Sequence, residues 1–182
     1  MIPSGVELPA AVEASDEPPH ILYVGRLAEE KGIRELVQAA AGLELVVVGD
    51  GPLRGFVPGA VGFVPHHELA GYYKRAAVVC VPSRREGYGV VAREAMAHGR
   101  AVVTTGVGGL ADAVDDGVTG LVVPPGDVPS LREALERLLA DPDLRNALGT
   151  AAREKAREAF AWPAATAATI AAYREAASDS TA

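Results

Sequence analysis

The chain has 182 residues, the size of a single domain, and a fold of that size buries roughly 70% of the surface that the unfolded chain exposes. Hydrophobic residues make up 49% of the chain and charged residues 23%, a globular composition that excludes general disorder. The formal net charge of −7 argues against a nucleic-acid-binding protein, which needs a basic face to displace counterions from phosphate.

Cysteine content and hydropathy indicate a cytoplasmic location. Cys80 is the only cysteine and lies in an apolar run, which is typical of a core residue in a reducing compartment, and it excludes any disulfide within the chain. The amino terminus lacks the pattern of a signal peptide, and no apolar run approaches the roughly 18 residues of a membrane span. We therefore expect a cytoplasmic protein without a membrane span.

The order of elements along the chain predicts an α/β domain. Residues 1–20 carry prolines and acidic residues without periodicity, which predicts a linker. Short apolar runs then alternate with amphipathic segments, and this alternation predicts a Rossmann-like parallel sheet with helices on both faces. The predicted strands are 21–24, 44–48, 61–64, 78–81, 101–104 and 121–123, and helices are predicted to begin near Gly32, His67, Gly89 and Leu110.

The last third of the chain has helical patterns and no further strand. Each of its three predicted helices carries proline where a first helical turn tolerates it. Asp141-Pro142-Asp143 has the D-x-D spelling of metal-dependent transferases, but its place before a helix predicts an N-cap and no metal site. The three predicted helices span 129–140, 142–159 and 163–177.

A first candidate site lies at the turn between the first strand and the first helix. Gly25-Arg26 ends the strand and Lys31-Gly32 opens the helix, so two cations flank a turn whose free N–H groups already favour an anion. Arginine and lysine both suit phosphate. The alternative is a solvated turn in which Lys31 pairs with Glu29 or Glu35.

A second candidate site follows the strand at 78–81. Two glycines flank Tyr88 and permit close approach of a ligand to the backbone. Glu86 precedes the next helix and Glu94 lies within it, eight residues or about two turns further along, a spacing suited to the hydroxyl groups of a bound sugar and ribose. Alternatively, Glu94 only pairs with a neighbouring cation. The basic residues Arg84 and Arg85 could pair with Glu86 or meet an anionic substrate.

A third pattern supports a competing hypothesis. Gly106, Gly108 and Ala111 fit G-x-G-x-x-A, and Asp127 follows about 20 residues later, as in a dinucleotide-binding fingerprint. The segment between these glycines and the next turn is only about seven residues, which is short for a crossover helix of roughly ten or more. An NAD-dependent oxidoreductase therefore remains the less favoured alternative.

Taken in order, these motifs resemble those of the family-4 glycosyltransferases of GT-B fold. The resemblance runs from about Ile2 to Trp162. It implies that the chain is one half of a GT-B fold and takes part in retaining sugar transfer from a nucleotide donor such as a UDP- or GDP-sugar, with no cofactor and no metal. The motifs that carry the resemblance are Gly25-Arg26, Lys31-Gly32, Gly49-Asp50-Gly51-Pro52, Pro82-Ser83, Glu86-Gly87-Tyr88-Gly89, Glu94-Ala95-Met96 and Gly108-Gly109.

The resemblance also implies a role for each candidate residue. Arg26 and Lys31 would hold the donor diphosphate, and Glu86 would face the donor sugar at the reaction centre, which makes these three the predicted catalytic residues. Glu94 would bind the ribose hydroxyls. The predicted substrate-binding residues are Gly25 beside Arg26, Phe63 and Val64 near the base, Gly87, Tyr88, Gly89 and Val90 around the sugar and phosphate, and Glu94.

Finally, the resemblance divides the chain into parts. Residues 1–20 resemble an interdomain linker, 21–160 the nucleotide-sugar-binding domain, and 161–182 the C-terminal crossover helix and tail. The expected partner is a missing amino-terminal, acceptor-binding domain, in cis or in trans, and we expect little transfer activity without it. The alternatives are a non-catalytic binding or interaction module of the same fold and the oxidoreductase.

Overall fold

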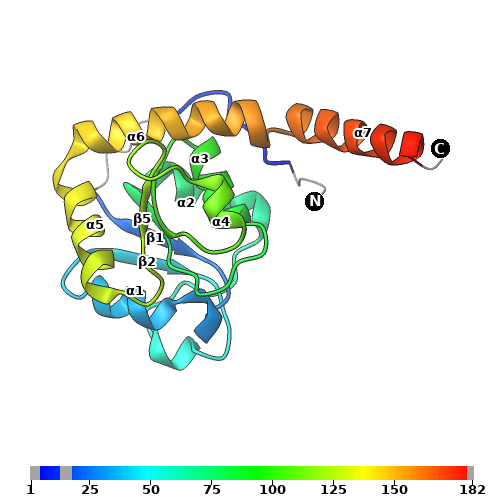
Figure 1. Ribbon diagram of the computed structural model, residues 1–182. Helices are drawn as coiled ribbons and strands as arrows, with labels where there is room; N and C mark the ends of the chain where they lie inside the picture. Colours follow the sequence, from blue (N-terminus) through cyan, green and yellow to red (C-terminus); the bar gives the residue numbers. More distant parts are fainter. Residues whose placement is uncertain (1–4, 13–17, 180–182) are drawn as a thin grey trace.

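A computed structural model describes residues 5–12 and 18–179, and its centre is a five-stranded parallel sheet (Figure 1). The strand order is β2-β1-β3-β4-β5, and every pairing is parallel, which confirms the predicted Rossmann-like sheet. The strands are β1 (Ile21–Val24), β2 (Leu45–Val48), β3 (Val78–Val81), β4 (Ala101–Thr105) and β5 (Leu121–Val123).

The strands are predominantly apolar because both faces of the sheet are covered, and the exceptions include Thr104 and Thr105 at the end of β4. Side chains alternate between the two faces with the period of two that a pleated strand imposes, so Ile21 and Tyr23 enter one core while Leu22 enters the other. The register places Ile21 opposite Val78 and continues the same alternation across β3. Each face therefore presents a continuous apolar surface to its helices.

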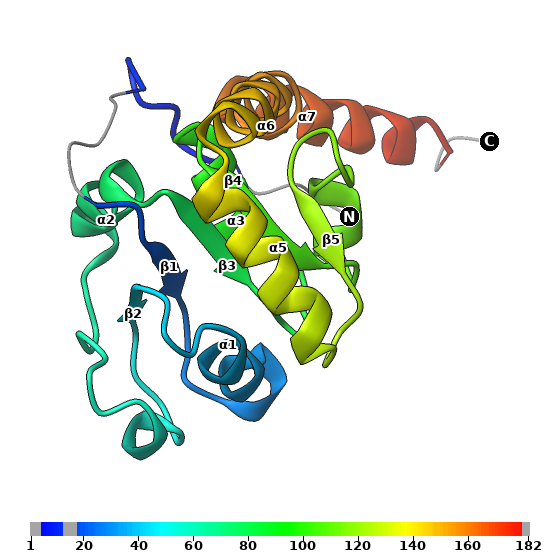
Figure 2. The ribbon, with the colours of Figure 1, turned by 90° about the vertical axis from the view of Figure 1, so that its left-hand side faces the viewer.

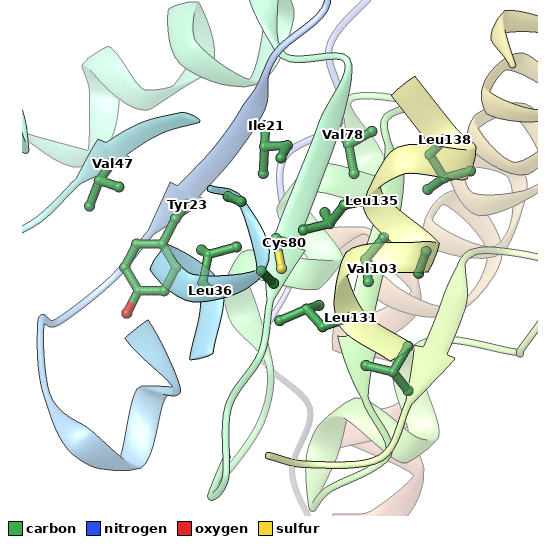
Figure 3. Close-up of a cluster of buried hydrophobic side chains, with 14 of the residues drawn as sticks. Ile21, Tyr23, Leu36, Val47, Val78, Cys80, Val103, Leu131, Leu135 and Leu138 are labelled. Carbon is green, nitrogen blue, oxygen red and sulfur yellow. The ribbon is translucent and has the colours of Figure 1, made fainter. Parts of the chain in front are cut away.

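The first face is covered by two helices. α1 (Ile33–Ala39) and α5 (Val128–Ala140) lie side by side on it (Figure 2). Leu131 and Leu135 of α5 pack against the strands together with the thiol of Cys80 (Figure 3). Cys80 is fully buried and free, as predicted for a core residue.

The second face is covered by the remaining short helices and by part of α6 (Pro142–Lys155). α2 (Leu69–Arg75) contributes Tyr73, and α3 (Val90–Ala97) contributes Met96. α4 (Gly109–Ala113) and α6 complete this layer. Helices therefore cover both faces, as the alternating pattern predicts.

One predicted strand is wrong. Residues 61–64 form no strand, and in this segment only Gly62 makes an isolated antiparallel bridge, to Gly49 beyond the end of β2. Gly62 has φ +97°, which breaks the extended conformation, and Pro65 has no N–H to donate. The segment continues into a short 3₁₀ helix, His66–Glu68. Two similar 3₁₀ helices lie in earlier connections, at Glu29–Lys31 and Arg54–Phe56.

Two of the C-terminal helices begin at aspartate caps, of which Asp141 was predicted and Asp127 was not. Asp127 and Asp141 accept hydrogen bonds from backbone N–H groups three residues later, so the D-x-D pattern is an N-cap of α6, as predicted. α6 continues into a π-helical turn (Ala156–Phe160), which is followed by α7 (Trp162–Asp179). In both views α7 extends away from the sheet and its covering helices (Figures 1 and 2).

The described part of the amino-terminal segment lies against this C-terminal region. The Val6 N–H donates to the Phe160 carbonyl at 2.8 Å, and Val6 pairs in parallel with Ala161. Of the predicted linker, residues 1–4 and 13–17 lie outside the described residues, as do residues 180–182 of the predicted tail. None of the described helices is long and apolar enough to cross a membrane.

The packing of α5 gives a test of this architecture. Leu135 is fully buried against the sheet, so Leu135→Ala should lower the free energy of unfolding by about 2 to 5 kcal/mol, through lost apolar burial and a residual cavity. Glu133→Ala, at an exposed position of the same helix, should change it by less than about 0.5 kcal/mol. Urea unfolding of both variants measures the difference, and equal effects would contradict the assignment of Leu135 to the core.

Candidate functional site

The sheet order creates a switch point between β1 and β3. From β1 the chain crosses to β2 on one side, whereas β3 lies on the other side of β1, so the connections that follow β1 and β3 leave the same edge in opposite directions. Ligands of open parallel sheets bind in the crevice at such a point. The first two candidate motifs lie in these two connections, residues 25–32 and 82–89.

The two connections are in close backbone contact. Gly32 has φ +66°, and a Cβ atom at this position would lie 2.0 Å from the Pro82 carbonyl oxygen. Only glycine fits both the left-handed backbone and this approach. In addition, the N–H groups of Arg84 and Arg85 donate to the Glu30 carbonyl at 2.9 and 3.2 Å.

Lys31 and Glu86 form an ion pair across the switch point. The Lys31 Nζ atom lies 2.8 Å from Glu86 Oε2, and the exposed fractions of the two side chains are 28% and 15%. The Ser83 hydroxyl donates to the same carboxylate oxygen at 3.2 Å. The structure thus brings together two of the three predicted catalytic residues.

The alternative partners of these charged residues are otherwise engaged. Glu29 accepts from Arg34, and Glu35 accepts from Arg84, so the interpretation of Lys31 as the partner of Glu29 or Glu35 is wrong. Arg84 likewise pairs with Glu35 and not with Glu86. Lys31 and Glu86 are therefore the pair that points into the switch point.

The surroundings of Glu86 favour its ionised form. Burial acts to raise the pKa of Glu86, whereas the hydrogen bond and the charge of Lys31 lower it. The Ser83 hydroxyl and the Gly89 N–H lower this pKa further, by smaller amounts. The net result is a pKa for Glu86 below its usual value. The site therefore holds a carboxylate that accepts hydrogen bonds at neutral pH.

Arg26 lies at the same edge but is more exposed. Its guanidinium is 3.7 Å from Glu30, and 64% of its side chain is accessible to solvent. The Tyr23 hydroxyl donates to the Arg26 carbonyl at 2.8 Å and so fixes the turn, while the Gly25 N–H donates to the Val48 carbonyl. The third predicted catalytic residue is thus available to a ligand on the surface of the turn.

The loop around Tyr88 leads directly into α3. Gly89 is its N-cap, with φ +74°, and Gly87 and Val90 are exposed on either side of Tyr88 and this cap. The first turn of a helix presents free N–H groups and a partial positive charge. The four residues predicted to meet sugar and phosphate therefore surround the positive end of α3.

The glycines of the dinucleotide-like pattern have a packing role. Gly108 has φ +51°, and a Cβ atom there would lie 1.9 Å from the Glu86 carbonyl oxygen. The Gly109 N–H donates to that same carbonyl at 3.3 Å. α4, which follows, has only five residues. These glycines let the connection after β4 support the Glu86 loop, which accounts for the pattern without a dinucleotide.

Glu94 belongs to a second polar cluster on the other side of α3. It accepts a hydrogen bond from the Tyr73 hydroxyl at 2.7 Å, and its other carboxylate oxygen lies 2.6 Å from His66 Nε2. Burial, followed by the Glu94 charge and hydrogen bond, raises the pKa of Tyr73 well above its usual value, so the phenol remains a donor. The Tyr73 ring also stacks on His98, with centroids 5.1 Å apart.

A cavity of about 380 Å³ opens beside this cluster. Sequence reasoning missed Tyr73 and His66, although a carboxylate on an apolar helical face signals that some partner is needed. The residues that line the cavity come from the amino-terminal segment, the 3₁₀ helix His66–Glu68, α2, and α3 with its C-cap: Glu7, Pro9, His66, His67, Leu69, Ala70, Tyr73, Glu94 and His98.

The predicted base-binding residues lie on the loop that leads to this cluster. Phe63 is 80% exposed, and Val64 is partly buried against the second face of the sheet. His66 follows two residues later and reaches Glu94. The described residues, this cluster included, contain no group of three or more His, Cys, Asp or Glu side chains that could hold a metal ion.

Comparison with known protein families and sequences gives a consistent result. The family described as Glycosyl transferases group 1 matches residues 18–141. The D-inositol 3-phosphate glycosyltransferase of Kribbella flavida is 48% identical over 113 residues, which cover 62% of this chain and 26% of that protein. The chain spans less than half the length of the curated relatives that it matches.

Solved structures with a similar fold are glycosyltransferases of GT-B type. Sucrose-phosphate synthase from Thermosynechococcus elongatus is 36% identical, with a TM-score of 0.85 over 98% of this chain and 52% of that one. The Anabaena HepE protein in complex with UDP has a TM-score of 0.75 at 21% identity, over 88% of this chain and 49% of that one. The second likeness concerns the fold alone.

The ion pair predicts a change in the titration of Glu86. Lys31→Met removes the interaction that opposes burial, so the pKa of Glu86 should rise, and carbon-13 NMR of its carboxyl group measures this directly. Lys155→Met is the matched control, because Lys155 forms an ion pair of the same 2.8 Å length with Asp115 elsewhere in the fold.

The same variant should change how stability depends on pH. Because the folded state of the wild type holds Glu86 at a lowered pKa, its stabilising contribution is present above the unfolded-state pKa and is lost as pH falls through the folded-state pKa. In Lys31→Met the folded-state pKa is higher, so that contribution should be smaller at neutral pH. An unchanged Glu86 pKa in Lys31→Met would contradict the ion pair.

Proposed function

The chain belongs to the group 1 glycosyl transferases, and on that premise we propose that it binds the nucleotide-sugar donor of a retaining glycosyltransferase. The observation that carries this proposal is the ion pair of Lys31 and Glu86 at the β1/β3 switch point, next to the amino terminus of α3. The cation and the free helix N–H groups there suit the diphosphate of a nucleotide sugar, and the carboxylate can accept hydrogen bonds from the sugar hydroxyl groups.

In this proposal the diphosphate lies between Arg26, Lys31 and the start of α3. Arg26 is exposed and reaches a surface ligand, whereas Lys31 is partly buried and already held by Glu86. A bound diphosphate would share Lys31 with Glu86 without breaking the pair, since an ammonium group has three donors. Helix N–H groups add donors that suit phosphate oxygens.

The two glutamates would contact the two sugars of the donor. Glu86 lies beside Lys31 and would accept hydrogen bonds from hydroxyl groups of the transferred sugar. Glu94 would accept from the ribose, whose hydroxyl groups would take the place of His66 while Tyr73 keeps its hydrogen bond. The exposed position of His66, of which 77% of the side chain is accessible, supports such an exchange.

The electrostatics of the switch point would favour departure of the nucleoside diphosphate. When the bond between the anomeric carbon and the diphosphate oxygen breaks, the oxygen keeps the electron pair and gains negative charge. Arg26, Lys31 and the positive end of α3 would stabilise that negative charge. Charged groups and dipoles positioned in advance of the reaction are the usual source of electrostatic catalysis. The acceptor hydroxyl would then form a bond to the anomeric carbon on the face that the diphosphate left, and its proton would pass to the departing diphosphate oxygen.

None of the residues named above is assigned to the acceptor. The chain spans less than half of the curated relatives that it matches, and we propose that a second, amino-terminal domain in cis or in trans supplies the acceptor site. We expect little or no transfer activity from residues 1–182 alone. We place the reaction in the cytoplasm, because the single cysteine is a free buried thiol, which fits a reducing compartment.

The binding proposal is tested with two substitutions and one control. Lys31→Met and Glu94→Gln should each weaken binding of the preferred nucleoside diphosphate sugar about tenfold, through loss of roughly 1.4 kcal/mol each. Lys155→Met should leave the affinity unchanged, because it removes an equivalent ion pair outside the switch point. Isothermal titration calorimetry with UDP-, GDP- and ADP-glucose measures all three, and UDP is the first choice because a protein of similar fold binds it.

Circular dichroism establishes that the variants remain folded. Wild-type affinity in both Lys31→Met and Glu94→Gln would reject the assignment of the donor site. Equal weakening in Lys155→Met would show that the loss reflects net charge rather than position.

A further inference from the structure

Arg93 is a buried cation that the proposed donor site does not use. It lies on α3 with only 4% of the residue exposed. Within the described part of the chain, its Nε and Nη1 atoms have no hydrogen-bond partner. Burying a guanidinium is unfavourable unless other groups compensate for the lost hydration. The charges of Asp112 and Glu86 act on Arg93 without forming a salt bridge to it, so a further, closer interaction is required to hold it there.

Two aromatic rings supply that interaction. The Arg93 guanidinium carbon lies 3.8 Å from the centroid of the Tyr88 ring and 4.6 Å from that of Phe160. Both distances are within the range of a cation–π interaction, and a planar guanidinium stacks well on rings. The cation therefore contacts two rings that are far apart in the sequence.

The two rings belong to functionally different parts of the fold. Tyr88 is flanked by Gly87 and Gly89 in the loop between Glu86 and α3, whereas Phe160 ends the π-helical turn before α7. The Phe160 carbonyl also accepts the Val6 N–H. Arg93 thus connects the Glu86 loop to the junction where the amino-terminal segment and α7 meet the domain.

We propose that Arg93 is a positioning residue that holds Tyr88 toward Phe160, so that the conformation of the loop at residues 86–89 depends on the junction at the base of α7. Glycines on both sides of Tyr88 give the loop backbone access to other conformations. The contact with Arg93 restricts that freedom. A shift of the junction, such as a movement of α7, would therefore be transmitted to the loop through Arg93.

The consequence for ligand binding rests on the proposed donor site, whereas the contact itself does not. If Gly87, Tyr88 and Gly89 meet the sugar and phosphate, a restrained loop binds with a smaller loss of conformational freedom than a free one. Arg93 never touches the ligand in this scheme. Arg93 instead restricts the conformations of the loop, and the restricted loop in turn binds the ligand with higher affinity.

The experiment uses the full chain and three substitutions. Arg93→Met keeps the length of the side chain and removes its charge, Phe160→Leu removes the second ring without touching the loop, and Arg93→Lys keeps the charge. Val114→Ala is the control for general destabilisation, because Val114 is buried in the same core layer. Amide hydrogen exchange of residues 87–90 is the main readout, and nucleotide affinity is the second.

We expect Arg93→Met and Phe160→Leu to speed exchange at residues 87–90 by about tenfold and to leave the amides of β3 within about twofold. Arg93→Lys should restore part of the protection. Val114→Ala should affect the whole second core layer without singling out the loop. If the donor site is correct, nucleotide affinity should fall in step with loop exchange.

Unchanged loop exchange in folded Arg93→Met and Phe160→Leu proteins would overturn the inference, as would an equal loop effect in Val114→Ala. Should Arg93→Met fail to fold, Phe160→Leu decides the question alone. A wild-type chain that binds no nucleotide would reject the donor-site proposal, and the exchange measurement would still decide the role of Arg93.

Discussion

The Glu86 residue holds the carboxyl edge of the sheet together. Its carboxylate accepts from Lys31 on the β1 side and from the Gly89 N–H at the start of α3. Its carbonyl accepts the Gly109 N–H from the β4 side. The three connections that follow three neighbouring strands therefore meet at one residue. At Gly32 and Gly108 these connections approach each other so closely that a Cβ atom would collide with a carbonyl group of the neighbouring connection.

This arrangement explains why the candidate site has two separate polar centres. α3 starts immediately after the Glu86 loop. It carries Glu94, which lies eight residues after Glu86 and faces α2. A long ligand that contacts both centres would have to pass the positive end of α3, where a diphosphate is best accommodated. The group 1 family to which the chain belongs fits this layout, and the nucleotide-sugar proposal follows from it.

Much of the fold could be predicted because its signals are local. The apolar runs at 78–81 and 101–104 become β3 and β4, and Asp141 caps its helix, since strand hydrophobicity and N-caps depend on neighbouring residues. The segment 61–64 is equally apolar, but the left-handed Gly62 and the missing N–H of Pro65 end it as a strand. That outcome depends on backbone geometry that hydropathy does not report.

The candidate site could be predicted as motifs but not as contacts. The sequence indicated that Lys31 needs an anion, and the partner turned out to be 55 positions away rather than in the same turn. Glu94 needed a donor, and Tyr73 comes from a different helix. Arg93 gave no signal, because a buried arginine between two rings depends on tertiary packing alone. Long-range partners of this kind require the fold.

Binding of a nucleoside diphosphate at the β1/β3 switch point can be measured by amide-resolved NMR titration of the wild-type chain with UDP, GDP, ADP and NAD. We expect saturable shifts with one nucleoside diphosphate, clustered at residues 25–32 and 86–94. Shifts with NAD at residues 106–112, or no saturable shift with any of the four, would contradict binding at this switch point.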